Sequence, residues 1–188
     1  GALAVLAGGE GRRMGGPKDQ LLVGGRPVLV VLMERLRWRG PTVLVAPHGG
    51  RVPRGHESFD VVAADAAPGQ GPLRGLLTAL DAARGEAVVV IPVDMPGVER
   101  EHAEWVERRL AERPESLGVM LKHAAKVEPF PCAFRAASRE MIRRRLESGD
   151  LAMHRLSEET GVNAVESPPE WGESIWRNIN QPGDLPDA

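Results

Sequence analysis

The sequence predicts a three-layer α/β fold with a mainly parallel sheet. Short runs of consecutive apolar residues alternate along the chain with segments of helical periodicity. Such alternation is typical of a parallel sheet covered by helices on both faces. The 188 residues match the size of one α/β domain, and no linker or internal repeat divides them. We therefore expect residues 1–188 to form a single domain.

The strands are expected where the apolar runs are continuous, because a strand buried on both faces needs no polar alternation. The first run stops at Gly8 and Gly9, and the most strand-like segment precedes Asp94. The expected strands are residues 2–7, 42–46, 60–64, 87–93, 118–121, 131–134 and 163–166.

The helices are expected where apolar residues recur every three or four positions. Residues 27–39 show this spacing, with Pro27 suited to the first helical position and Gly40 to the stop. Further helices are expected after Pro72 and over 99–112, 137–146 and 153–160, and the triplet Arg143–Arg145 is interpreted as a solvated helix face. The remaining segments 47–58, 66–71 and 122–130 are expected to be loops.

Composition excludes several classes of protein. The formal net charge is −2, without the basic excess that is usual for nucleic-acid binding. No apolar run approaches the ~20 residues of a membrane span. Cys132 is the single cysteine, so an internal disulfide and a cysteine-based zinc site are ruled out, and the residue is expected to be a buried small hydrophobe. A reducing, cytoplasmic location is expected.

A glycine-rich loop follows the first predicted strand and runs from Leu6 to Lys18. Glycines let the backbone approach a ligand closely, and exposed N–H groups there form an anion-binding concavity. Arg12, Arg13 and Lys18 add positive charge that can bracket a triphosphate. The loop is neither a Walker A motif nor a complete dinucleotide fingerprint. It is interpreted as a triphosphate-binding loop, the alternative being an ordinary glycine-rich turn.

Asp94 follows the central strand over 87–93, where open α/β sheets bind their ligands. A carboxylate there suits Mg²⁺, which is held by one or two carboxylates together with substrate phosphates. The alternative is a turn aspartate or a cap for the next helix. Asp65 also follows a predicted strand and could accept hydrogen bonds from ribose hydroxyls, unless it only caps its loop. The loop after it opens a helix whose N-terminus could hold an anion.

Near the end of the sequence, Asn178 and Asn180 can place both amides on one face of an extended segment. Asn180 could then orient a metal or a phosphate, whereas the alternative is a docked terminal segment. Trp171 and Trp176 are interpreted as anchors of this terminus, the alternative being that their exposure marks a ligand or partner surface. The segment 122–134 is a candidate lining of an acceptor site.

In this order along the chain, the motifs resemble those of the molybdenum cofactor guanylyltransferase family. The matching segments are Leu6-Ala-Gly-Gly…Arg13-Met-Gly, Asp65…Gly71-Pro-Leu-Arg-Gly75, Val93-Asp-Met-Pro96, Glu128-Pro-Phe-Pro-Cys-Ala-Phe134 and Asn178-Ile-Asn-Gln-Pro-Gly-Asp-Leu185. The resemblance implies a Rossmann-like, glycosyltransferase-A-type nucleotidyltransferase fold. It also implies Mg²⁺-dependent transfer of GMP from GTP to molybdopterin, with proteins that deliver molybdopterin or accept the finished cofactor as further partners.

Carried over position by position, the resemblance implies catalytic roles for Arg13, Lys18 and Asp94, and metal ligation by Asp94 and Asn180. The nucleotide contacts that it implies are Leu6, Ala7, Gly8, Gly9, Arg13, Lys18, Asp65 and Asp94. Two positions depart from the family pattern. Pro17-Lys18 precedes Asp19, where the family often has Asp-Lys, and Pro47 stands where the family tends to have asparagine.

Three other functions are compatible with parts of the sequence. A related nucleotidyltransferase could use CTP with molybdopterin, or a sugar or alditol phosphate as acceptor. A nucleotide-binding scaffold would bind without turnover. A Rossmann-type oxidoreductase is disfavoured, because no acidic ribose partner follows the second strand at Ala46-Pro47.

Overall fold

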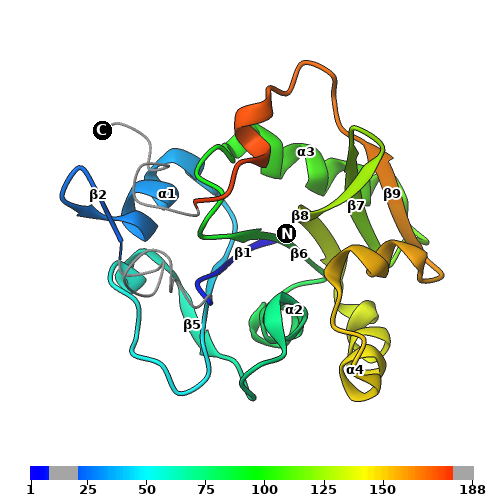
Figure 1. Ribbon diagram of the computed structural model, residues 1–188, viewed down its shortest axis with the longest axis horizontal. Coiled ribbons are helices and arrows are strands. Elements are labelled where there is room, and N and C mark those ends of the chain that lie inside the picture. Colours follow the sequence, from blue (N-terminus) through cyan, green and yellow to red (C-terminus); the bar gives the residue numbers. More distant parts are fainter. Residues whose placement is uncertain (9–20, 180–188) are drawn as a thin grey trace.

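The computed structural model describes residues 1–8 and 21–179, which are arranged in three layers around a seven-stranded sheet (Figure 1). The strand order is β5-β4-β1-β6-β8-β7-β9. β8 is antiparallel to both of its neighbours, whereas the other pairs in this sheet are parallel, so the predicted mainly parallel α/β fold is confirmed. The strands are β1 (Ala2–Leu6), β4 (Thr42–Ala46), β5 (Val61–Ala64), β6 (Ala87–Pro92), β7 (Gly118–His123), β8 (Lys126–Arg135) and β9 (Val162–Glu166).

The central strands are apolar throughout because both of their faces are covered. All five residues of β1 and all five of β4 are buried. Parallel pairing in register joins Leu3 to Thr42 on one side and to Val89 on the other. The predicted strands that correspond to β1, β4 and β6 were therefore located correctly from hydrophobicity alone.

In the described part of the chain, four α-helices cover the sheet, two on each face (Figure 1). They are α1 (Val28–Leu36), α2 (Gly71–Ala82), α3 (Arg100–Ala111) and α4 (Arg139–Ser148). The 3₁₀ segments η3 (His56–Ser58) and η4 (Ala136–Ser138) lie between helices, and η5 (Met153–Glu158) and η6 (Glu173–Trp176) follow α4. A two-stranded ribbon, β2 (Leu22–Val23) and β3 (Arg26–Pro27), leads into α1. None of the helices within residues 1–8 and 21–179 is long and apolar enough to cross a membrane.

The structure corrects three expectations. Residues 122–130 are not a loop, because β7 and β8 form a hairpin whose turn is Ala124 and Ala125, both at positive φ. Such a turn usually carries asparagine or glycine, and neither is present to signal it. The helix expected over 153–160 is instead the 3₁₀ segment η5, which ends at Glu158. The first helix ends at Leu36 rather than Arg39, because Arg37 is left-handed and its N–H donates to the Met33 carbonyl.

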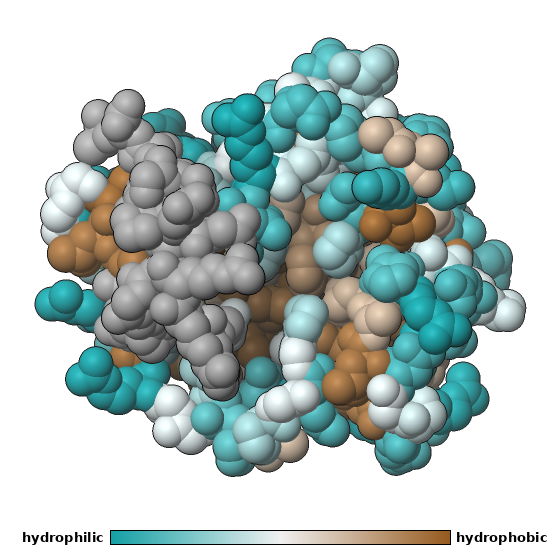
Figure 2. Space-filling view, in the orientation of Figure 1, coloured by the Kyte–Doolittle hydropathy of each residue, from teal (hydrophilic) through white to brown (hydrophobic). Residues whose placement is uncertain are grey.

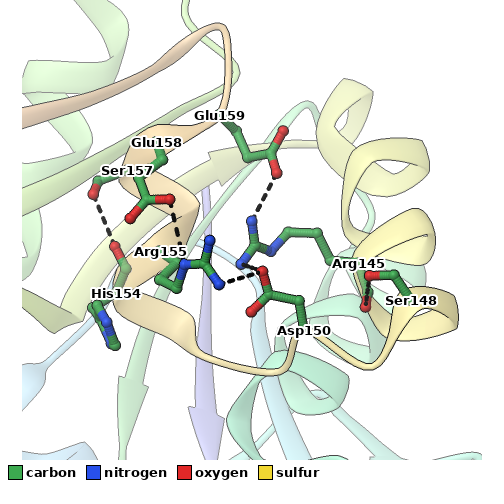
Figure 3. A network of polar contacts seen from close by, with 8 residues as sticks. All are labelled: Arg145, Ser148, Asp150, His154, Arg155, Ser157, Glu158 and Glu159. Atoms are coloured by element: carbon green, nitrogen blue, oxygen red, sulfur yellow. Dashed lines mark hydrogen bonds and ion pairs between the residues drawn. The ribbon is translucent and has the colours of Figure 1, made fainter.

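The interpretation of Arg143–Arg145 as a solvated face is wrong for Arg145, which is 8% exposed. Its guanidinium contacts Asp150 and Glu159 at 2.8 Å each, and Arg155 from η5 reaches the same Asp150 carboxylate at 3.0 Å (Figure 3). The periodicity of α4 did not reveal this, because both carboxylates come from segments that follow the helix. The network ties α4 to η5 and to the residues that flank η5.

Candidate nucleotide-binding site

A cavity of about 660 Å³ lies at the edge of the sheet where β1, β4, β5 and β6 end. The carboxyl ends of parallel strands share one edge, and ligands of open α/β sheets bind there. Figure 2 shows a recess near the middle of the view, with apolar surface at its bottom and hydrophilic surface above and below it. The strand ends that form it are bonded to one another, since Ala7 N–H donates to Val45 and Val93 N–H donates to Leu6.

The first strand brings the start of the glycine-rich loop to the cavity. Leu6 and Gly8 line it, and a Cβ atom built at Gly8 would meet no atom of the described residues within 4 Å. The Ala7 side chain is buried, and its N–H is engaged in the sheet. The other predicted residues of the loop, Gly9, Arg13 and Lys18, lie outside the described residues.

Asp65 lies at the end of β5 and lines the cavity, as its place after a strand predicts. Its Oδ1 accepts the Thr78 hydroxyl at 2.6 Å, and its backbone N–H donates to Ala46. Burial raises the pKa of this carboxyl, while the Thr78 hydrogen bond and the charges of Arg74 and His48 act in the opposite direction. The side chain is half-buried, so it offers a partly desolvated acceptor to a ligand.

The loop between Asp65 and α2 forms the adjoining wall. Gly69 and Gly71 adopt positive φ, which lets the chain turn tightly before the helix begins. Gln70 precedes α2, and its Oε1 accepts the Arg74 Nε–H at 2.7 Å. The prediction that this loop opens a helix is confirmed.

Asp94 follows β6 and lines the middle of the cavity, between Leu6 and the residues of β8. Asp94 is half-buried and is engaged in a further interaction. Hard oxygen donors of this kind fit Mg²⁺, which needs only one or two carboxylates when substrate phosphates supply the other ligands. Within residues 1–8 and 21–179, no group of three His, Cys, Asp or Glu side chains forms a metal cluster.

Residues 177–179, which follow η6, pack beside Asp94. Ile179 donates its N–H to the Asp94 carbonyl at 2.8 Å, and Asn178 lines the cavity. Asn180, the predicted metal ligand, lies outside the described part of the chain. The docking agrees with the interpretation of this segment as a packed terminus.

The far end of the cavity is lined by Glu128, Pro129 and Phe130 of β8, together with Trp176 of η6. Trp176 stacks on His123 with ring centroids 4.8 Å apart and planes at 19°. Trp171 packs edge-on against Trp105 and His102 of α3, which supports its predicted role as an anchor. The segment 122–134 thus contributes to the site, as a strand rather than as a loop.

Sequence reasoning missed the place of His48 in the cavity. His48 lies two residues after β4, at the same edge of the sheet as Asp65 and Asp94. Its position soon after a predicted central strand is the signal that could have revealed it. The alternative that an exposed Trp176 marks a ligand surface fits the structure, since its side chain forms part of the cavity wall.

Comparison with known proteins places the chain in a family. The profile of the MobA-like NTP transferase domain matches residues 3–164. A probable molybdenum cofactor guanylyltransferase of Thermococcus kodakarensis is 31% identical over 97% of this chain and 90% of the relative. The molybdenum cofactor guanylyltransferase of Cereibacter sphaeroides is 34% identical over 96% and 91%.

Solved structures agree at the level of the fold. Molybdopterin-guanine dinucleotide biosynthesis protein A from Archaeoglobus fulgidus superposes with a TM-score of 0.75 at 24% identity, covering 98% of this chain and 95% of that one. The 2-C-methyl-D-erythritol 4-phosphate cytidylyltransferase of Thermus thermophilus gives 0.62 at 22% identity, covering 97% and 94%. The predicted nucleotidyltransferase fold is confirmed. The chain belongs to the family of MobA-like NTP transferase domains and is a nucleotidyltransferase.

Proposed function

We propose that this protein acts in molybdenum cofactor biosynthesis and transfers GMP from GTP to molybdopterin, with release of pyrophosphate and dependence on Mg²⁺. The observation that carries the proposal is the convergence of Gly8, Asp65 and Asp94 on one cavity at the carboxyl ends of parallel strands. Relatives that cover nearly the whole chain at 31% and 34% identity bear the name molybdenum cofactor guanylyltransferase, which supports the choice of substrates.

The cavity divides into three parts along the edge of the sheet. The ends of β4 and β5 and the loop before α2 would hold the nucleoside, with Asp65 as an acceptor. Gly8 and Asp94 lie between this part and the residues of β8, where the phosphates would bind. The residues of β8 and η6 would then receive molybdopterin.

In the reaction, the terminal phosphate of molybdopterin attacks the α-phosphorus of GTP in line. A phosphorus–oxygen bond forms there as the bond to the leaving pyrophosphate breaks. The protein mainly positions the reactants and neutralises charge, as is usual for phosphoryl-type transfer. Asp94, with Asn180 as a predicted second ligand, would hold Mg²⁺, which supplies positive charge to the phosphate oxygens. Arg13 and Lys18 are predicted to stabilise the departing pyrophosphate.

The test replaces the carboxylate of Asp94 by an amide of the same shape. Asp94→Asn should lower pyrophosphate release from GTP and molybdopterin about a hundredfold or more, because a neutral ligand holds Mg²⁺ poorly. Asp81→Asn is the matched control. Asp81 is an exposed carboxylate on α2 that contacts Arg139 and Arg143 away from the cavity, so near-normal turnover is expected. Wild-type turnover in a folded Asp94→Asn protein would refute the proposal.

A thermal-shift panel separates the alternative functions. GTP, CTP, ATP and NAD are each added with and without Mg²⁺, and the proposal expects the largest stabilisation with GTP and Mg²⁺. A larger shift with CTP would favour a cytidylyltransferase. A shift with GTP but no pyrophosphate release on adding molybdopterin would favour a nucleotide-binding scaffold.

A further inference from the structure

The nucleoside end of the cavity contains two polar side chains whose hydrogen-bonding roles are fixed by the protein itself. They are His48, two residues after β4, and Gln70, directly before α2, and both line the cavity. Each uses one polar atom on a protein partner, so the chemical character of its other polar atom follows.

His48 is oriented by the backbone of Asp65. Its Nδ1 lies 2.9 Å from the Asp65 carbonyl oxygen. A carbonyl can only accept, so Nδ1 must carry the hydrogen and donate it. In the neutral ring the lone pair is therefore on Nε2, which becomes an acceptor. Within the described chain, no residue donates to this atom.

Gln70 is oriented by Arg74 in the opposite sense. The Arg74 Nε–H can only donate, and it lies 2.7 Å from the Gln70 side chain, so the atom that it reaches is the amide oxygen. The amide nitrogen of Gln70 then keeps its two N–H groups for a ligand. Gln70 thus presents donors to the cavity.

Asp65 lines the same cavity, contacts His48 through its backbone carbonyl and adds a second acceptor. Its Oδ1 is engaged by Thr78, and no other described side chain donates to its Oδ2. The nucleoside end therefore presents two acceptors, on His48 and Asp65, and one donor group, on Gln70. Guanine carries the complementary set on one edge: the donors N1–H and N2–H₂ and the acceptor O6. Cytosine carries one donor, N4–H₂, and two acceptors, N3 and O2.

We infer that His48 and Gln70, together with Asp65, recognise the guanine base, with His48 accepting from a base N–H and Gln70 donating to O6. The inference rests on the proposed function and extends it to residues that determine the choice of base. A site that hydrogen-bonds a substrate group discriminates against an analogue that leaves its polar groups unpaired. Cytosine would place an acceptor against one of the two acceptors of this site.

The test measures binding, so that it does not depend on catalysis. The dissociation constants of GTP and CTP are determined by calorimetry with Mg²⁺ and without molybdopterin, for wild type, His48→Phe and Gln70→Glu. Phenylalanine keeps a flat ring and removes both nitrogens. Glutamate keeps the oxygen that Arg74 contacts and removes the N–H donors. Each change should weaken GTP binding about two- to tenfold and leave CTP binding nearly unchanged.

His154→Phe is the matched control, since His154 is exposed on η5 and does not line the cavity. If His48→Phe does not fold, His48→Ala tests the same loss on a smaller side chain. An unchanged ratio of GTP to CTP affinity in both folded variants would overturn the inference and leave the proposed function intact. Tighter binding of CTP than GTP by the wild type would overturn the inference and the guanine assignment together.

Discussion

Gly97 lies very close to the backbone of η6, and replacing it by alanine should affect both stability and activity. Gly97 lies in the loop between β6 and α3, three residues after Asp94. A Cβ atom built there would lie 2.2 Å from the Ser174 carbonyl oxygen and 2.7 Å from its carbon. Both are backbone atoms of η6, so a rotamer change cannot relieve the contact. We expect Gly97→Ala to push η6 away from the Asp94 loop.

The size of the effect follows from two opposing terms. Ordinary contact begins near 3.4 Å, so the two segments must separate by about 1 Å. Overpacking of this kind costs about 1–3 kcal/mol. Ile175 and Ile179 are each 1% exposed, and burying such a side chain contributes about 1.5–3 kcal/mol. The two isoleucines together outweigh the clash, so the segment should stay docked but displaced.

The displacement should also affect the site. The Ile179 N–H holds the Asp94 carbonyl at 2.8 Å, and Trp176 and Asn178 form part of the cavity wall. A misplacement of about 1 Å can cost up to a hundredfold in rate when reactants must be aligned. We therefore expect Gly97→Ala to lower kcat/KM about ten- to hundredfold.

Urea unfolding measures the free energy of unfolding, and pyrophosphate release from GTP and molybdopterin measures turnover. The expected loss of stability corresponds to a fall in Tm of about 2–4 °C per kcal/mol for a chain of this size. Gly85→Ala is the control, because an added Cβ there meets nothing within 4 Å. If Gly97→Ala unfolds within about 0.5 kcal/mol of the control and turns over normally, the reasoning is refuted.

Two further predictions concern stability. Burial lowers the pKa of His102 below its usual 6.5, so the folded protein favours the neutral ring. The contribution of His102 to the free energy of unfolding is therefore complete above that pH and declines as the pH falls toward the folded-state pKa. Its Nδ1 accepts the Glu99 N–H at 2.9 Å, and a glutamine side chain can make the same contact. His102→Gln should therefore flatten the dependence of the unfolding free energy on pH between about 7.5 and 5. An unchanged slope would contradict this. Arg145→Met should cost about 3 kcal/mol of stability in urea unfolding, because it leaves two carboxylates without their buried partner. Arg155→Met, at an exposed member of the same network, should cost less than about 1 kcal/mol, and equal losses would show that burial does not set the difference.

The sequence by itself determined the features that depend on local pattern. The runs at β1, β4 and β6 are apolar because both faces are buried, so their positions could be found without the structure. Asp65 and Asp94 were each predicted to follow a strand, and both line the cavity at the edge where the carboxyl ends of the parallel strands lie. The burial of Cys132, which is 0% exposed, was also predictable, because the residue lies within a predicted strand.

Only the tertiary structure decided the contacts between segments far apart in the chain. The turn at Ala124 and Ala125 carries no glycine or asparagine signal, so the β7–β8 hairpin is fixed by pairing across the sheet. The burial of Arg145 depends on carboxylates that packing brings to it. His48 and Trp176, which are 128 positions apart in the sequence, both line the cavity because β4 and η6 end there. Gly97 must be glycine because η6 packs directly against its backbone. No local periodicity records such approaches, since they arise from how the faces of separate elements pack together.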